Sequence, residues 1–234
     1  MAEYFRIDLP DKHKDIIQNI KIEKNFDPFS HFHNPSWKSF EGNSKGTLYE
    51  YIYKSIINVS AKNKPKLARD AAKIINKILE LAIVKLSKNM NIKNFNKLVW
   101  LRYRTESNEF DEPRWHSDFY YTINDNFNTY TNQKKIIISL IGPGTLILKC
   151  DNDMNEEINK KLIELQGKYR EPSLENFRNI NNEISENLKS CEIKQLENFE
   201  GVIYNIGGEA DSCIHSEPKF NKPRLFLGLV LNEI

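Results

Sequence analysis

The pattern of apolar positions changes from helical to strand-like in the middle of the chain. Residues 65–87 carry apolar side chains at the spacing of an amphipathic helix, and Pro65 suits its first turn. Residues 48–59 (LYEYIYKSIINV) fit a helix or a strand, because their apolar and aromatic positions match both periods. Residues 1–47 include a stretch rich in Pro, Asn, Ser and Gly, which predicts loose structure.

Short apolar segments follow. KLVWLRYR and RWHSDFYY are typical of strands, and KKIIISLIGPGTLIL predicts two strands joined by a Gly-Pro-Gly turn. Residues 152–198 return to helical periodicity. FEGVIYNIGG then predicts a strand, and PRLFLGLVL predicts a strand buried on both faces. This order predicts an α+β chain with an antiparallel β core and helices packed outside it.

Composition narrows the class of protein. The 234 residues suffice for one domain with a sizeable core, and a net charge of +2 with 28% charged residues is typical of a globular protein. No apolar run approaches the roughly 20 residues of a membrane span, and the N-terminus lacks the apolar region of a secretory signal. The three cysteines form no CxxC pair. We therefore expect a cytoplasmic protein in a reducing setting.

Positive charge is concentrated between Lys62 and Lys97, a segment with ten basic residues and only two acidic ones. Such a helix face can meet nucleic acid or another acidic partner, or it can be a solvated surface. Phe95 is the one aromatic residue in this stretch of the sequence, too little interleaving to argue for base stacking. Nucleic acid is left open as a partner on this ground alone.

One pair of residues suggests metal chemistry. His116 and Asp118 lie two apart, so they share one face of the predicted strand, and Tyr120 follows them on that face as a candidate pocket residue. An HxD pair is common by chance. His215, however, directly precedes the last strand, and Arg224 opens that apolar strand nine residues later. A guanidinium there needs an anion, either a structural partner or a carboxylate ligand, and the upstream HxD favours the ligand.

The order HSD, then His, then Arg resembles the motif of the Fe(II)/2-oxoglutarate-dependent oxygenases, in particular that of their prolyl-hydroxylase-like members. LVWLRYRTESNEFDEPRWHSD is similar to the segment that leads into HxD in such members. FEGVIYNIGGEADSCIHSEPKFNKPRLFLGL is similar to their closing pattern of strand, turn, His, Pro and Arg. The resemblance covers about residues 98–150 and 198–232.

The resemblance implies a double-stranded β-helix (jelly-roll, cupin-like) core and a hydroxylase that uses Fe(II), 2-oxoglutarate and O₂. It implies that His116, Asp118 and His215 are the metal ligands and the catalytic centre. Arg224 would bind the far carboxylate of 2-oxoglutarate with a planar two-pronged cation. Tyr103 would be a second cosubstrate contact. Arg102 and Arg104 flank Tyr103 on the opposite face, where we expect solvent.

The resemblance, which does not extend to the first 97 residues or to the helical insertion, and the helical periodicity of those two regions together suggest the domain organisation. Residues 1–234 form one oxygenase-like domain, in which residues 1–97 are an N-terminal helical support region. Residues 98–150 and 198–234 form the β core, and residues 151–197 are a helical insertion. The insertion either caps a substrate site or decorates the fold elsewhere.

Other interpretations stay open. A zinc hydrolase could use the same three ligands with Glu217 as general base, although Arg224 would then have no assigned role. A noncatalytic binding protein on a degenerate barrel could use the Lys62–Lys97 segment as its partner surface. The strand after Arg224 lacks the second Arg of the nucleic-acid demethylase branch, which counts against repair of alkylated bases. For an oxygenase, the substrate is a protein or peptide side chain or a small molecule.

Overall fold

Two antiparallel sheets and five helices make up the described part of the chain. The computed structural model describes residues 2–26, 29–32, 40–41, 47–91, 95–107, 111–118, 133–169, 173–207 and 212–233. Within these ranges the larger sheet has the strand order β1 (Glu3–Arg6), β8 (Glu200–Asn205), β5 (Gln133–Ile141), β10 (Arg224–Glu233), β4 (Phe95–Arg104), β2 (Phe29–Phe32) and β3 (Phe40–Glu41). The smaller sheet has the order β7 (Glu192–Gln195), β6 (Leu146–Lys149) and β9 (His215–Ser216). The fold is therefore mixed α/β.

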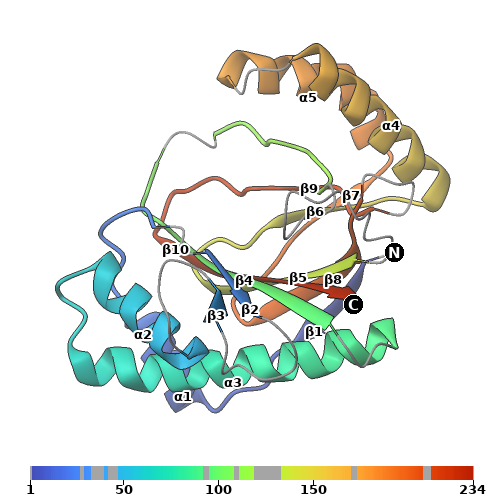
Figure 1. The fold of residues 1–234 in the computed structure, drawn as a ribbon. Coiled ribbons are helices and arrows are strands. Elements are labelled where there is room, and N and C mark those ends of the chain that lie inside the picture. The colour runs from blue at the N-terminus through green and yellow to red at the C-terminus, as the bar shows by residue number, and fades with distance from the viewer. Residues whose placement is uncertain are drawn as a thin grey trace.

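The helices lie on opposite sides of the two sheets. α1 (Asp11–Gln18), α2 (Leu48–Val59) and α3 (Pro65–Met90) cover the outer face of the larger sheet. α4 (Asn152–Lys168) and α5 (Leu174–Leu188) form a hairpin beyond the smaller sheet (Figure 1). No helix in the described ranges combines the length and the apolar character that crossing a membrane requires.

Local sequence explains the first helices. α3 begins at Pro65, as predicted, and ends where Asn91 adopts a left-handed conformation (φ 54°). α2 settles the ambiguity of residues 48–59 in favour of a helix, because Thr47 and Glu50 form a reciprocal capping box at its start. The expectation of loose structure for residues 1–47 was wrong in part, since β1 is a strand of the larger sheet and α1 is a helix packed against it.

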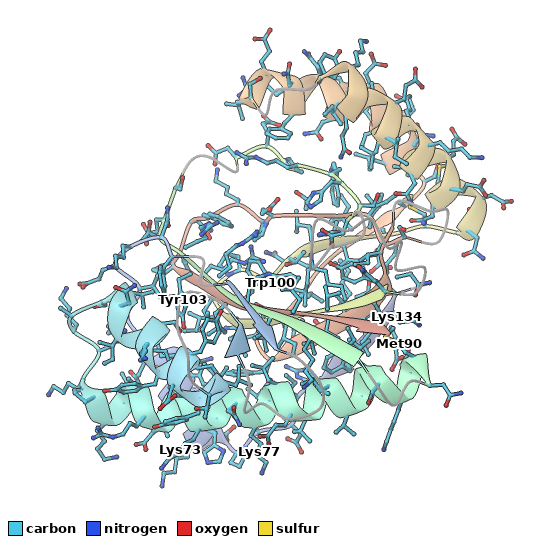
Figure 2. All side chains as sticks on the ribbon, in the orientation of Figure 1. Lys73, Lys77, Met90, Trp100, Tyr103 and Lys134 are labelled. Carbon is cyan, nitrogen blue, oxygen red and sulfur yellow. A yellow bond between two sulfur atoms is a disulfide. The ribbon has the colours of Figure 1, made fainter. Side chains whose placement is uncertain are left out.

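The basic segment divides between surface and core. Lys73 and Lys77 lie on the exposed side of α3 and point to solvent (Figure 2). Lys97 instead lies in β4 and is 1% exposed. The positive charges of the sequence segment therefore do not form one continuous face.

β10 is the central strand of the larger sheet and is buried on both faces, as predicted. Leu225 and alternate residues after it face the helices and join the larger core cluster. Phe226 and Val230 face the smaller sheet, where they pack with Trp100 of β4. Because alternate residues point to opposite faces, Arg224 shares the inner face with Phe226. The space between the two sheets is therefore the space that Arg224 enters.

The α4–α5 hairpin is joined at its base by a disulfide between Cys150 and Cys191. This corrects the expectation of reduced cysteines; Cys213 is free and buried. The predicted helical insertion, residues 151–197, also ends differently, because its last part is β7, a strand of the smaller sheet.

Candidate metal centre

His116 and His215 meet across an antiparallel bridge at the edge of the smaller sheet. The His116 amide donates to the His215 carbonyl over 3.0 Å, and the His215 amide donates to the His116 carbonyl over 2.9 Å. Among described residues, the predicted strand 114–121 is reduced to this single bridge. Tyr120, the candidate pocket residue, lies outside the described residues. The bridge brings together two histidines that are 99 residues apart (215 − 116) in the chain.

Asp118 completes a compact group of possible metal ligands. One ligand atom from each of His116, Asp118 and His215 lies within 4.8 Å of the other two. The His215 Nε2 is 3.5 Å from the Asp118 Oδ2, and the two imidazole centroids are 4.3 Å apart. Two imidazoles and one carboxylate are a donor set suited to a divalent transition metal. These three residues could hold a metal ion.

The backbone orients both imidazoles toward such an ion. His116 Nδ1 is 2.7 Å from the Arg114 carbonyl oxygen, and His215 Nδ1 is 3.2 Å from the Cys213 carbonyl oxygen. A carbonyl only accepts, so each Nδ1 carries the proton and each Nε2 keeps its lone pair. Burial lowers the pKa of His215 to about 3, which keeps this ring neutral at ordinary pH. Neutral imidazole is the form that binds metals.

Asp118 is held as an anion by neighbours from the larger sheet. Its Oδ2 accepts hydrogen bonds from Lys135 Nζ at 2.6 Å and from the Tyr204 hydroxyl at 3.1 Å. Although burial alone raises the pKa of Asp118, the Lys135 ammonium outweighs it through its charge and its hydrogen bond, and holds that pKa well below its ordinary value. The third candidate ligand is therefore ionised.

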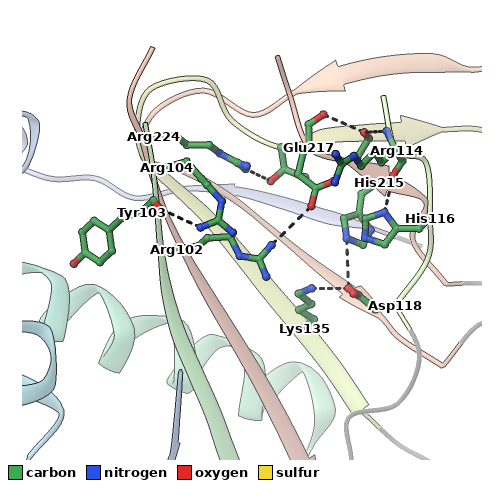
Figure 3. A network of polar contacts seen from close by, with 12 residues as sticks. Arg102, Tyr103, Arg104, Arg114, His116, Asp118, Lys135, His215, Glu217 and Arg224 are labelled. Atoms are coloured by element: carbon green, nitrogen blue, oxygen red, sulfur yellow. Dashed lines mark hydrogen bonds and ion pairs between the residues drawn. The ribbon is translucent and has the colours of Figure 1, made fainter. Parts of the chain in front are cut away.

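Arg224 is 1% exposed and lies on the inner face of the larger sheet (Figure 3). Its Nη2 donates to Thr145 Oγ1 over 2.6 Å, and its guanidinium stacks on Phe226 at 4.3 Å. Its Nε and Nη1 are buried without a hydrogen-bond partner among the described residues. Burial lowers the pKa of Arg224 to about 9, so it remains a cation at neutral pH. Among the described residues, two donors of this cation are thus buried on the inner face without a partner, which is costly unless an anion meets them.

The structure reverses the predicted faces around Tyr103. β4 pairs with β10 so that Arg104 lies opposite Arg224 and Tyr103 lies opposite Leu225. Tyr103 is therefore in the core between sheet and helices, where its hydroxyl hydrogen-bonds to Ser55 of α2 at 2.8 Å. Burial raises its pKa. Its assignment as a cosubstrate contact is corrected: Figure 3 shows the ring directed away from the triad.

Arg102 and Arg104, expected at solvent, share the inner face with Arg224. Arg102 Nη1 is 3.8 Å from Glu217 Oε1, and its guanidinium lies over Phe226 at 5.2 Å. Glu217 follows His215 by two residues, and its Oε2 is buried without a hydrogen-bond donor among the described residues. Burial opposes ionisation of Glu217, yet His116, His215 and Arg102 together lower its pKa. A second carboxylate therefore lies beside the triad.

Three residues of the site were not singled out from the sequence. Lys135 and Tyr204 lie in strands whose sequence predicts only structural roles, and Thr145 directly follows the Gly-Pro-Gly turn. Alternation along the strands was the signal in the sequence that could have placed Lys135 and Tyr204 on the inner face. Lys135 shares a face with Ile137 and Tyr204 shares a face with Val202, and both Ile137 and Val202 belong to the inner core cluster. Only the pairing of β5 with β8 reveals that both polar groups approach Asp118.

The α4–α5 hairpin braces the segments that carry the two histidines. Trp115 and Ile214, the residues directly before His116 and His215, share a buried cluster with residues of both helices. Asn181 of α5 donates to the Pro113 carbonyl over 2.9 Å, and Asn159 of α4 donates to the Ser212 carbonyl over 3.0 Å. The insertion therefore packs against the two segments that carry the histidines.

Comparison with known proteins adds little to this geometry. No family model matches the chain, and no curated protein matches it. Among solved structures, it is similar to a prolyl-4-hydroxylase from Pseudomonas putida at 9% identity, with a TM-score of 0.36 over 100% of this chain and 92% of that chain. A likeness this weak leaves the function to be inferred from the residues of the site.

Proposed function

We propose that this chain is an Fe(II)- and 2-oxoglutarate-dependent dioxygenase. It hydroxylates a C–H bond of a protein or peptide side chain or of a small molecule, with release of succinate and CO₂. The observation that carries the proposal is Arg224: a buried cation with two unmatched donors, on the inner face that the His116–Asp118–His215 group also borders.

The path of the chain supports a double-stranded β-helix core. From β4 onward the chain visits the larger sheet, then the smaller sheet at His116, and then the larger sheet again at β5. It continues through β6 and β7 in the smaller sheet, β8 in the larger, β9 in the smaller and β10 in the larger. Such alternation between two facing antiparallel sheets is what a jelly-roll requires.

The three ligands suit the metal chemistry. His116 and His215 would bind through Nε2 and Asp118 through its carboxylate, which leaves positions of the ion open for other ligands. When bound, Fe(II) supplies the redox chemistry that couples O₂ and decarboxylation of 2-oxoglutarate to hydroxylation of the substrate. The neutral state of the His215 imidazole keeps this nitrogen available at ordinary pH.

Arg224 would bind the carboxylate of 2-oxoglutarate that does not reach the metal. Its planar fork presents two parallel N–H groups to a carboxylate, which a lysine ammonium cannot do. Nη2 donates one of its two hydrogens to Thr145, and its other N–H stays parallel to an N–H of Nε or Nη1 for a carboxylate; Phe226 supports the guanidinium plane. The cation is thus preorganised for an anion that enters from the triad side.

A second candidate is supported by Glu217. A metal hydrolase needs a carboxylate near the metal to act as general base, and Glu217 Oε2 is buried beside the triad with no hydrogen-bond donor in the described part of the chain. This candidate leaves the two unmatched donors of Arg224 without a role. The oxygenase accounts for more of the site.

Anaerobic addition of Fe(II) and 2-oxoglutarate tests the proposal. We expect the weak visible charge-transfer band of the chelated complex, and succinate once air is admitted with a substrate. Arg224→Lys should weaken 2-oxoglutarate binding about 10- to 100-fold, the worth of a bidentate charge-assisted contact. The control is Arg6→Lys, because Arg6 forms an ion pair with Glu197 in which both side chains are exposed.

Absence of the band in the wild-type protein would refute the oxygenase. Zinc-loaded protein that cleaves an activated ester, and loses this activity in Glu217→Gln, would establish the hydrolase instead. Equal 2-oxoglutarate affinity in Arg224→Lys and wild type would remove the role assigned to Arg224.

A further inference from the structure

Lys135 is a buried cation placed directly against a candidate metal ligand. It lies on the inner face of β5, where the whole residue is 5% exposed. Its ammonium is 2.6 Å from Asp118 Oδ2 and stands over the rings of Trp100 and Tyr204, with centroids at 5.0 and 5.9 Å. The cation is therefore held in place by aromatic faces as well as by the carboxylate.

The contact falls on an oxygen that also borders the histidines. Asp118 Oδ2 accepts the Tyr204 hydroxyl at 3.1 Å and lies 3.5 Å from His215 Nε2. Tyr204 and Lys135 thus act on the same ligand oxygen, one with a neutral donor and one with a charge. A hydroxyl orients the carboxylate, whereas an ammonium also cancels its charge.

The charge of the donor set follows from these contacts. Imidazole binds a metal ion in its neutral form, so a set of two imidazole ligands and one carboxylate carries one negative charge, which the Lys135 ammonium offsets. Glu217, the other described carboxylate beside the triad, has Arg102 as an ion-pair partner at 3.8 Å. A divalent ion bound here would keep nearly its full positive charge. Such an ion is held less tightly by the protein and attracts anionic ligands more strongly.

We propose that Lys135 is a positioning residue that neutralises the charge of Asp118. The site therefore binds its metal ion less tightly, and the bound ion binds an anionic ligand more tightly. The metal part of this inference stands on the triad alone. The part that concerns 2-oxoglutarate rests on the proposed function. A dianionic cosubstrate is the kind of ligand that a metal centre of this charge favours.

The test compares three variants by titration with Co²⁺, which reports binding through its visible spectrum, and then with azide and 2-oxoglutarate on the Co²⁺-loaded protein. Lys135→Met removes the charge. Tyr204→Phe removes only the neutral hydrogen bond. Lys134→Met is the matched control, because the neighbouring side chain is exposed and donates to Asn89 instead.

We expect Lys135→Met to bind Co²⁺ about tenfold more tightly and azide about tenfold more weakly, because a like charge near the ion is gone. Tyr204→Phe should weaken Co²⁺ binding, as removal of an orienting partner does. Lys134→Met should match the wild type. If Lys135→Met does not fold, Lys135→Gln takes its place, since it keeps a hydrogen-bond donor without the charge.

A purely structural ion pair would not make Co²⁺ binding tighter and azide binding weaker in the same Lys135→Met variant. Weaker Co²⁺ binding in Lys135→Met, or azide affinity equal to that of the wild type, would overturn the inference. If azide shows the expected shifts while 2-oxoglutarate does not bind the wild type, the proposed function fails and the role of Lys135 stands. A wild-type protein that binds no Co²⁺ would remove both.

Discussion

Reduction of the Cys150–Cys191 disulfide should destabilise the protein and loosen the metal centre. The bond joins residues separated by 41 positions and closes the base of the α4–α5 hairpin. The chain-entropy relation gives about 4 kcal/mol for a closed loop of this length, and measured losses for native disulfides are about 2–5 kcal/mol. We therefore expect the free energy of unfolding to fall by about 2–4 kcal/mol in the Cys150→Ser, Cys191→Ser double variant.

The loss should be concentrated in the hairpin and in the segments that the hairpin braces. Trp115 is 4% exposed and Ile214 is fully buried, and both are packed by residues of α4 and α5. Local opening of the hairpin removes the support behind His116 and His215. Metal affinity should therefore fall together with stability, whereas backbone amides of the larger sheet and of α3 should stay protected from hydrogen exchange.

Urea denaturation and amide hydrogen exchange, each with and without a reducing agent, measure these effects. Cys213→Ser is the control: its thiol is buried and unpaired, so this variant should keep the wild-type response to reduction. Equal unfolding free energies under oxidising and reducing conditions would refute the prediction. So would an increase in exchange as large in α3 as in α4 and α5.

Three further outcomes are expected from burial. The pKa of His215 is 6.5 in the unfolded chain and about 3 in the fold, so protonation of this residue favours unfolding. As pH falls from 6.5 toward 3, the unfolding free energy of the metal-free protein should drop by up to about 1.4 kcal/mol per pH unit. Denaturation of His215→Gln should lack this contribution to the slope. Tyr103→Phe should cost about 0.5–1.5 kcal/mol in urea denaturation by removing the hydrogen bond to Ser55, which keeps its bond to the Ile52 carbonyl, yet leave the Fe(II)–2-oxoglutarate band unchanged. Gly228→Ala should cost about 1–3 kcal/mol or more, since the added methyl would meet the Trp100 ring at 2.1 Å; thermal denaturation equal to wild type would contradict this.

The pattern of apolar residues predicted much of the fold, because the helices and strands concerned are determined by residues close together in the chain. The apolar spacing that defines α3 and the uninterrupted apolar run of β10 depend only on neighbours in the chain. The candidate ligands were also visible, because His116 and Asp118 are two apart and His215 precedes the last strand. The hydrogen bonds between the His116 and His215 backbones were not visible, since they join segments distant in sequence.

The sequence by itself determined which residues of a strand share a face. Only the tertiary structure decided which face looks into the site. Period two placed Tyr103 opposite its two arginine neighbours but could not tell inside from outside. The register of β4 against β10 assigns Arg102 and Arg104 to the site and Tyr103 to the helix-side core. Register is set by long-range packing of both faces at once, and so are the Lys135 contact with Asp118 and the bracing of both histidines by the hairpin.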